Sequence, residues 1–243
     1  MWGLGFVFVF LVLLLLFAIL GKKKKAIFRE IPAFKQLINA IGLAVEEGKQ
    51  VHFSLGRGSV NGPESTSSFI GLSVLERIGN VTCTSDFPVV ATTGEGALGI
   101  LTQDVLRASF RGSKGEYRYD TTLAQISGLT PFSYAVGTMR PVMDERVSVN
   151  VLMGHYGSEV AFIGDAIGRG HSFGLAGSDS LVAQALMYAT VQETLIGEEY
   201  FASGAYLGAG NMHLASLRTQ DVFRWMLVLI ILIGSALKLM GVL

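Results

Sequence analysis

Glycine-rich turns carry the side chains that are best suited to binding a ligand. The first of them, residues 56–62, reads Gly-Arg-Gly-Ser-Val-Asn-Gly. Its arginine can pair with an anion, and its serine and asparagine can form hydrogen bonds through their side chains. The loop lacks the Lys-Ser/Thr ending of a phosphate-binding P-loop, so nucleotide hydrolysis does not follow. We predict a site for a small anionic ligand here, with a structural turn as the alternative. The candidate residues are Gly56, Arg57, Gly58, Ser59 and Asn61.

Three further turns share one plan, in which a strand is followed by a glycine-containing turn and then by a helix. Residues 94–99 also match the G-x-G-x-x-G dinucleotide fingerprint, and Asp120 lies about twenty residues beyond. Glu95 opposes nucleotide binding, because its carboxylate would repel a pyrophosphate. Close packing of strand against helix is the alternative reading. The candidate ligand-binding residues of these turns are Gly94, Gly96, Gly154, His155, Ser158, Gly177 and Ser178.

A serine nucleophile is a further candidate, because residues 170–174 match the G-x-S-x-G pattern of the hydrolase nucleophile elbow. Ser172 would be the nucleophile, with Asp179 and His213 following in hydrolase chain order. The mechanism requires this serine on a sharp turn between a strand and a helix, whereas Ser172 falls at the start of an expected strand. We therefore expect no catalytic residues, and a serine hydrolase stays as an alternative.

Metal and disulfide chemistry are not expected. The four histidines, His52, His155, His171 and His213, show no metal-ligand spacing, and Cys83 is the only cysteine of the chain. We therefore expect no metal site and no cofactor.

Zero net charge removes the main electrostatic argument for nucleic-acid binding. The chain has 243 residues with 19 basic and 19 acidic side chains, and 50% of its residues are hydrophobic. No basic excess is available to neutralise a phosphate backbone, so we expect no nucleic-acid partner. The hydrophobic fraction excludes a disordered chain. Residues 26–222 carry 13 basic and 19 acidic side chains, a net charge of −6, and the balancing charges lie near the two ends.

Apolar segments at both ends predict two transmembrane helices. Residues 2–20 contain no charged side chain, and residues 225–243 contain only Lys238, near the end. The lysines at 22–25 follow the first segment, while Arg218 and Arg224 precede the second. The positive-inside rule then predicts a two-pass membrane protein, with its central domain in the cytoplasm and both termini outside. The predicted divisions are a transmembrane helix at 1–21, a basic collar at 22–25, a domain at 26–222 and a transmembrane helix at 223–243.

Between the two spans, strands alternate with helices. This alternation predicts an α/β fold with a mostly parallel sheet and flanking helices, whose ligands bind beyond the carboxyl ends of the strands. We also expect the last helix to continue without a break into the second span, because no Gly or Pro intervenes before Gly234. The expected strands are residues 51–55, 81–84, 89–92, 117–120, 148–153 and 171–176. The expected helices are residues 32–47, 65–78, 96–110, 131–141, 159–167, 181–189 and 212–224.

Several segments resemble an uncharacterised bacterial family of anchored membrane proteins known only as a domain of unknown function. The resemblance covers nearly the whole central domain. It implies the architecture and a place in the inner membrane of a bacterium, and it assigns no activity or catalytic residue. The segments that carry it are LGRGSV (55–60), LSVLERI (72–78), NVLMGHYGSE (150–159), LIGEE (195–199), SGAYLG (203–208) and HLASLRTQDVFRW (213–225).

These observations favour a non-catalytic, membrane-anchored module that serves as an oligomeric scaffold or as a sensor of a small ligand. The expected partners are the lipid bilayer, further copies of the chain and a small anionic ligand. The alternative is a nucleotide- or dinucleotide-binding protein, or a serine hydrolase, that uses the loops after the strands.

Overall fold

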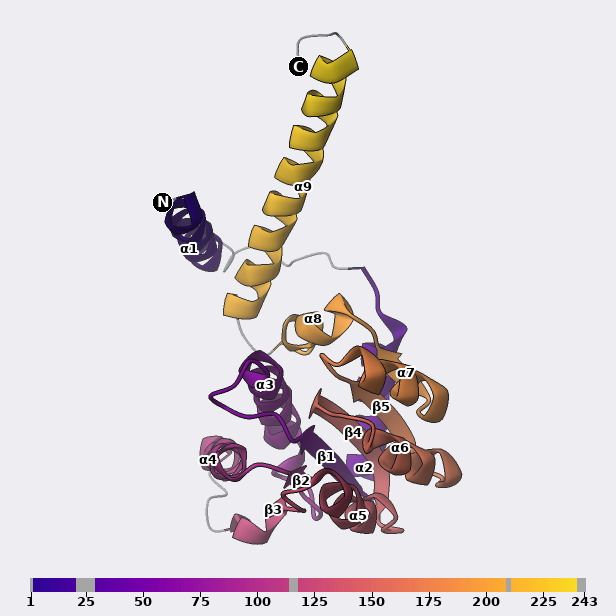
Figure 1. Ribbon diagram of the computed structural model, residues 1–243. Helices are drawn as coiled ribbons and strands as arrows, with labels where there is room; N and C mark the ends of the chain where they lie inside the picture. The colour runs from indigo at the N-terminus through magenta and orange to yellow at the C-terminus, as the bar shows by residue number, and fades with distance from the viewer. Residues whose placement is uncertain (1, 21–28, 114–117, 209–210, 240–243) are drawn as a thin grey trace. The chain divides into compact units, whose positions relative to one another are not determined.

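The computed structural model describes residues 2–20, 29–113, 118–208 and 211–239 (Figure 1). It divides into two compact units, one formed by Met1–Arg29 with Gly210–Leu243 and the other by Glu30–Ala209. The lysines of the expected basic collar, at 22–25, lie outside the described residues.

The larger unit is built on a six-stranded parallel sheet. Its strand order is β3-β2-β1-β4-β5-β6, and every neighbouring pair is parallel. The expected α/β fold with a parallel sheet is therefore confirmed. The strands are β1 (Gln50–Gly56), β2 (Val90–Thr93), β3 (Ala124–Ile126), β4 (Val147–His155), β5 (Phe173–Gly177) and β6 (Glu193–Leu195).

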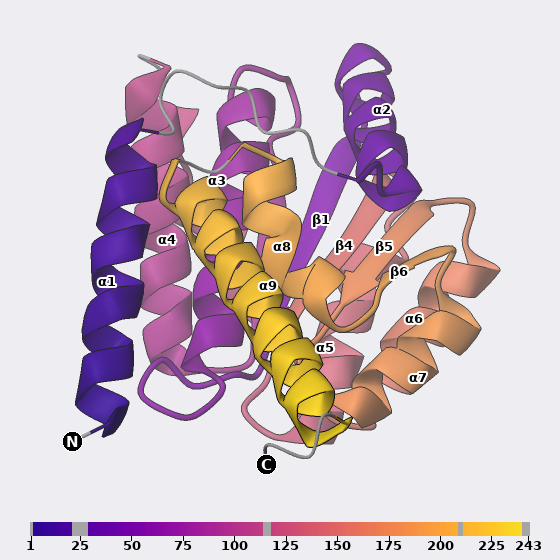
Figure 2. The ribbon, with the colours of Figure 1, turned by 90° about the horizontal axis from the view of Figure 1, so that it is seen from above.

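Helices cover both faces of this sheet (Figures 1 and 2). Helices α2 (Pro32–Glu46), α3 (Ser65–Thr82), α4 (Gly96–Gly112) and α8 (Glu198–Tyr206) pack on one face. Helices α5 (Pro131–Val142), α6 (Val160–Arg169) and α7 (Leu181–Thr190) pack on the other. The change of face occurs between α4 and α5, so the helices that follow β1 and β4 lie on opposite faces.

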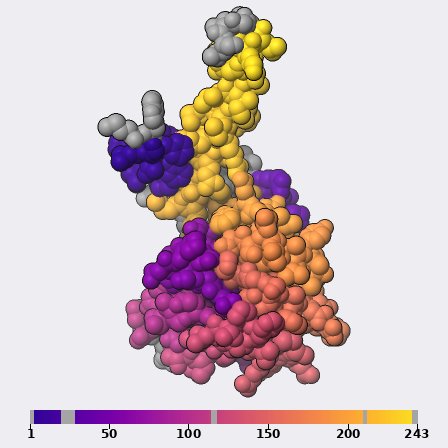
Figure 3. Space-filling model, in the orientation of Figure 1, coloured from indigo at the N-terminus to yellow at the C-terminus, as the bar shows by residue number. Residues whose placement is uncertain are grey.

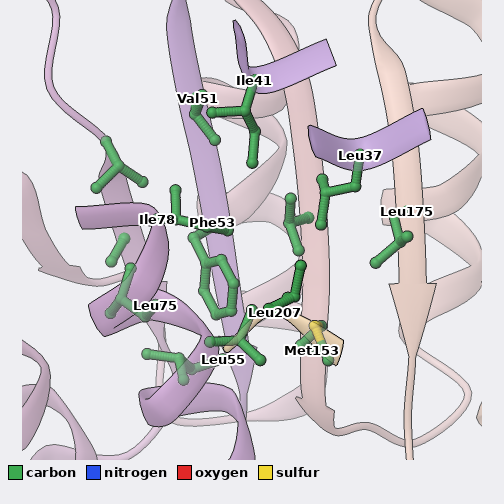
Figure 4. Packing of buried hydrophobic residues seen from close by; sticks show 14 of the residues in the cluster. Leu37, Ile41, Val51, Phe53, Leu55, Leu75, Ile78, Met153, Leu175 and Leu207 are labelled. Carbon is green, nitrogen blue, oxygen red and sulfur yellow. The ribbon is translucent and has the colours of Figure 1, made fainter. Parts of the chain in front are cut away.

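The larger hydrophobic core lies between the sheet and the helices of the first face. Figure 4 shows Phe53 and Leu55 of β1 beside Leu75 and Ile78 of α3. Period-two alternation directs Val51, Phe53 and Leu55 to this face, and it directs His52 and Ser54 to the opposite one. The second face thus receives polar side chains in the middle of a buried sheet.

Two expected strands are wrong. Residues 81–84 read as a β-branched strand, but α3 continues to Thr82. The Thr82 hydroxyl donates to the carbonyl of Ile78 and accepts from the amide of Val89, so this threonine ends the helix instead of joining the sheet. Of residues 117–120, Tyr117 lies outside the described residues and Asp120 caps a short 3₁₀ helix, η3 (Thr121–Leu123).

The smaller unit contains two apolar helices, α1 (Trp2–Leu20) and α9 (Asn211–Leu239). Helix α9 is unbroken, which confirms the expected continuous helix, and residues 212–239 are long and apolar enough to cross a membrane. Helix α1 is apolar but shorter. The ring of Phe223 in α9 contacts Phe6 and Phe10 of α1, with ring centroids 4.7 and 5.8 Å apart. Among the described residues, α9 is therefore the one helix that is long and apolar enough to anchor the protein in a membrane.

Candidate functional site

The carboxyl ends of β1 and β4 form the topological switch point of the sheet. These two strands are neighbours, yet the chain leaves β1 toward α3 on one face and leaves β4 toward α6 on the other. Ligands of open parallel sheets bind in the crevice that opens where the strand order reverses, and the order 3-2-1-4-5-6 is the one found in dinucleotide-binding folds. The loops at this crevice are residues 57–64 and 156–159, which contain most of the predicted ligand-binding side chains.

Arg57 and Glu159 face each other across the switch point. The Nη1 atom of Arg57 lies 3.5 Å from Oε1 of Glu159, which also accepts a 3.0 Å hydrogen bond from the amide of Gly157. Glu159 is almost fully buried, and the Arg57 side chain is 26% exposed. The Nε atom of Arg57 is buried and has no hydrogen-bond partner among the described residues. The guanidinium thus makes one long contact and keeps unused donors.

His155 and Asp179 form a second polar pair at the same edge. The Nδ1 atom of His155, at the end of β4, lies 2.9 Å from Oδ1 of Asp179, which follows β5. Ser178 adds a longer contact of 3.4 Å to the same oxygen. About a third of the His155 side chain is exposed. The carboxylate fixes the orientation of the imidazole and leaves its Nε2 edge available to a ligand.

Buried hydroxyl groups form hydrogen bonds with one another and with the backbone at the carboxyl end of β1. The hydroxyl groups of Tyr134 and Ser54 lie 2.6 Å apart, and Tyr156 donates to the Ser54 hydroxyl at 2.7 Å. The amide of Gly56 donates to the Tyr134 oxygen at 3.0 Å. Burial raises the pKa of both tyrosines above its ordinary value, so both are neutral donors and acceptors at physiological pH. These contacts hold the start of the Arg57 loop in place.

The glycines of these turns are required by the packing of the protein itself. A Cβ on Gly154 would overlap the Leu55 carbonyl, and one on Gly56, which has a φ of 71°, would overlap the His155 carbonyl. A Cβ on Gly58, Gly94 or Gly177 would collide with Ser68, Arg57 or Tyr200. Gly96 alone among the candidate glycines has open space around it. The side chains of these turns, and not the glycines, are therefore the groups that can bind a ligand.

Comparison with known proteins places the chain in a family. A family model described as a domain of unknown function, DUF6754, matches residues 1–243. The chain belongs to the DUF6754 family. This match confirms the resemblance to a family known only as a domain of unknown function. No curated protein and no solved structure matches the chain.

In this DUF6754 protein, the carboxylate of Glu95, inside the dinucleotide motif, caps the helix that follows the motif. Glu95 accepts a 2.6 Å hydrogen bond from the amide of Leu98 and caps α4. The helix N-terminus that would face a pyrophosphate is therefore already neutralised. Asp120 caps η3 instead of following a strand. These contacts remove the support for a dinucleotide site at residues 94–99.

The predicted hydrolase residues of this DUF6754 protein are not assembled into one site. Ser172 precedes β5 and Asp179 follows it, so the two residues lie at opposite ends of this strand. Asp179 pairs with His155, and Ser172 accepts a hydrogen bond from Asn150. His213 belongs to the other unit.

Other sequence-predicted residues keep local roles. The Ser59 hydroxyl accepts from the amide of Asn61, within the first turn. The backbone carbonyl of Ser158 accepts a hydrogen bond from the amide of Ala161 at the start of α6. Sequence reasoning missed Glu159 as the partner of Arg57, although its place two residues after Gly157 was the available signal. In the part of the chain that the structure describes, no three His, Cys, Asp or Glu side chains are grouped to hold a metal ion.

Proposed function

We propose that this protein is a membrane-anchored sensor that binds a small ligand with an anionic group at the switch point between β1 and β4. The observation that carries the proposal is that the Arg57 guanidinium keeps a hydrogen-bond donor without a partner among the described residues. Its side chain is mostly buried and its Nε atom has no partner among the described residues. Buried polar groups are nearly always hydrogen-bonded in folded proteins, so an unused guanidinium donor at a ligand crevice favours a ligand role.

The electrostatics of the crevice favour an anionic group of limited charge. Helices α3 and α6 both begin at this edge, and helix N-termini attract negative charge. The Glu159 carboxylate already offsets part of the Arg57 charge. A ligand with one anionic group and neighbouring hydroxyls suits this balance, because the anion would take the free Arg57 donors while the hydroxyls meet His155 and Asp179.

For the membrane arrangement, we propose two spans with the larger unit in the cytoplasm. Helix α9 supplies one span, and α1, which contacts it through Phe6 and Phe10, supplies the second. Arg218 and Arg224 precede the apolar part of α9, which supports a cytoplasmic position for that end.

Replacing Arg57 is the direct test of the ligand site. We expect millimolar inorganic phosphate, acetate or adenosine monophosphate to stabilise the full chain in detergent micelles, by about 2.7 kcal/mol at a hundredfold excess over Kd. Arg57→Ala should abolish this stabilisation because it removes the only cation of the crevice that we assign to the ligand. Thermal unfolding followed by circular dichroism measures the effect.

The matched control is Arg77→Ala, which removes an exposed arginine of α3 away from the crevice and should keep the full stabilisation. If the Arg57 variant responds like the wild type, or if no anion of the panel stabilises the wild type, the proposed site is wrong. A response to adenosine monophosphate alone would turn the proposal toward the nucleotide alternative.

An oligomeric scaffold is a second candidate function, favoured by an exposed apolar surface on α5 and α6. This α5–α6 patch consists of Phe132 and Val136 of α5, Phe162 of α6, and Leu129, which lies two residues before α5; all four are 52–69% exposed. The rings of Phe132 and Phe162 lie 6.1 Å apart, so the patch is continuous between the helices. In the space-filling view, the magenta to salmon segments that include α5 and α6 form an open surface of the larger unit (Figure 3). Exposed apolar patches of this kind mark association surfaces.

A charge placed in the patch should prevent self-association. We expect Val136→Glu to shift the protein from an oligomer to a monomer, because burying an unpaired carboxylate in an apolar interface is unfavourable. Light scattering coupled to size-exclusion chromatography in micelles measures the mass. Ile100→Glu on α4 is the control, since Ile100 is equally exposed but lies on another helix. A wild type that is monomeric at micromolar concentration would contradict the scaffold function.

A further inference from the structure

A cavity lies at the amino ends of β4 and β5, whereas the switch point lies at the carboxyl ends of the strands. Its volume is about 660 Å³, which is in the usual range for small-molecule sites. Apolar side chains from α5, β4 and α6 line part of it, namely Met139, Val142, Val147 and Ala166. The function proposed above uses none of these residues, so the cavity needs its own explanation.

Helix C-termini give this cavity a negative potential. In a parallel α/β sheet the helices run opposite to the strands, so α2, α5 and α6 all end at this edge. The cavity is lined by residues of their last turns or C-caps, including Glu47, Val142 and Arg169. The carbonyl groups at a helix C-terminus carry a partial negative charge and favour a cation.

The formal charges of the lining side chains also sum to a negative value. Four carboxylates line it, those of Glu47, Asp144, Glu145 and Asp165, against the cations Lys49 and Arg169. Arg169 pairs with Asp165 at 2.9 Å, and Lys49 donates to the backbone carbonyl of Glu145. Asp144 pairs with Arg146 at 2.8 Å, and this hydrogen bond lowers the pKa of Asp144 to about 2. Within the described ranges, the carboxylates of Glu47 and Glu145 have no ion-pair partner.

A fixed hydroxyl group lies on the wall between the two strands. Ser172 lines the cavity, is 7% exposed and accepts a 2.9 Å hydrogen bond from Asn150. The Asn150 amide is held in turn by His52, which also contacts Thr92. This chain of contacts fixes the Ser172 oxygen, which has a second lone pair for a donor from a ligand.

We propose that the amino-edge cavity is a binding site for a small organic cation, an ammonium group carried on a short apolar chain. The ammonium group lies toward the unpaired carboxylates of Glu47 and Glu145 and the ends of the three helices. The apolar chain lies against Met139, Val142 and Val147. This site is separate from the anionic site at the switch point, and its occupancy does not depend on Arg57.

Three probes of equal chain length and different charge test the proposal: n-butylammonium, 1-butanol and butyrate. Saturation-transfer NMR on the full chain in detergent micelles reports which of them binds. We expect n-butylammonium to bind, 1-butanol to bind at least tenfold more weakly and butyrate not to bind. Butyrate binding as tight as that of n-butylammonium, or no signal from n-butylammonium at about 20 mM, would overturn the proposal.

Charge reversal at the cavity locates the binding. Glu145→Lys should weaken n-butylammonium binding about tenfold, because it turns an attraction between exposed charges into a repulsion. Glu145 is exposed, so this variant should fold. The control Glu76→Lys makes the same change on the exposed side of α3 and should bind like the wild type, as should Arg57→Ala. Equal binding by the Glu145 and Glu76 variants would show that the cavity is not the site.

Discussion

Gly154→Ala is expected to lower the free energy of unfolding by about 3 kcal/mol, a large effect for one methyl group. Gly154 lies in β4, and its Cβ would overlap the carbonyl carbon and oxygen of Leu55 in β1. Both of these are backbone atoms of a buried central strand, so no side-chain rotation can relieve the overlap. The two strands would have to separate at the switch point. Urea unfolding of the full chain in micelles, followed by circular dichroism, measures the loss.

The matched variant is Gly96→Ala, at the first position of α4, where an added Cβ meets nothing within 4 Å. It should be neutral or stabilising by up to about 1 kcal/mol, because alanine favours the helix over glycine. If these glycines instead admitted a ligand, both variants would be stable and only ligand binding would change. A Gly154 variant with wild-type stability would therefore contradict the packing role.

The sequence was most informative where strand, turn and helix are long enough to show a period. The segment from β4 to α7 was predicted within about two residues at each boundary, because its strands are buried on both faces and its helices have one apolar face. Strands β3 and β6 were missed. Each has three residues, and such short strands are defined by the neighbours with which they pair and not by a pattern of their own.

The turns of the candidate site were predictable, but their side-chain partners were not. The turns lie at one edge because all six strands are parallel, which the alternation of strands and helices indicates. The pairing of His155 with Asp179 requires β4 beside β5, and the contact of Arg57 with Glu159 requires β1 beside β4. Chain order does not give this arrangement, and it led to Asp179 being grouped with Ser172 and His213.

His52 should make the stability of the protein depend on pH. This histidine is fully buried, with Nδ1 2.9 Å from Asn150 Oδ1 and Nε2 2.9 Å from the Thr92 hydroxyl. Because the Asn150 amide nitrogen donates to Ser172, its oxygen is the acceptor, so the neutral ring donates from Nδ1 and accepts at Nε2. Burial lowers the pKa of His52 from 6.5 to about 4, against a smaller opposing effect of the Asn150 hydrogen bond.

The difference in proton binding between the folded and unfolded protein determines how the free energy of unfolding changes with pH. Between pH 6.5 and 4 the unfolded chain binds a proton at His52 and the folded protein does not, so stability is full above pH 6.5 and falls as the pH is lowered. The expected loss is about 3 kcal/mol by pH 4. His52→Gln keeps a donor and an acceptor but cannot titrate, so its free energy of unfolding should fall by about 3 kcal/mol less over this range.

Urea unfolding at pH 7, 5.5 and 4 compares the wild type with His52→Gln. The other histidines are present in both proteins of the His52 comparison, and their contributions cancel in the difference. Parallel curves for the wild type and the His52 variant would mean that His52 is protonated in the folded protein. The buried contact of its Nε2 atom with the Thr92 hydroxyl would then have to rearrange, because a protonated ring has no acceptor to offer.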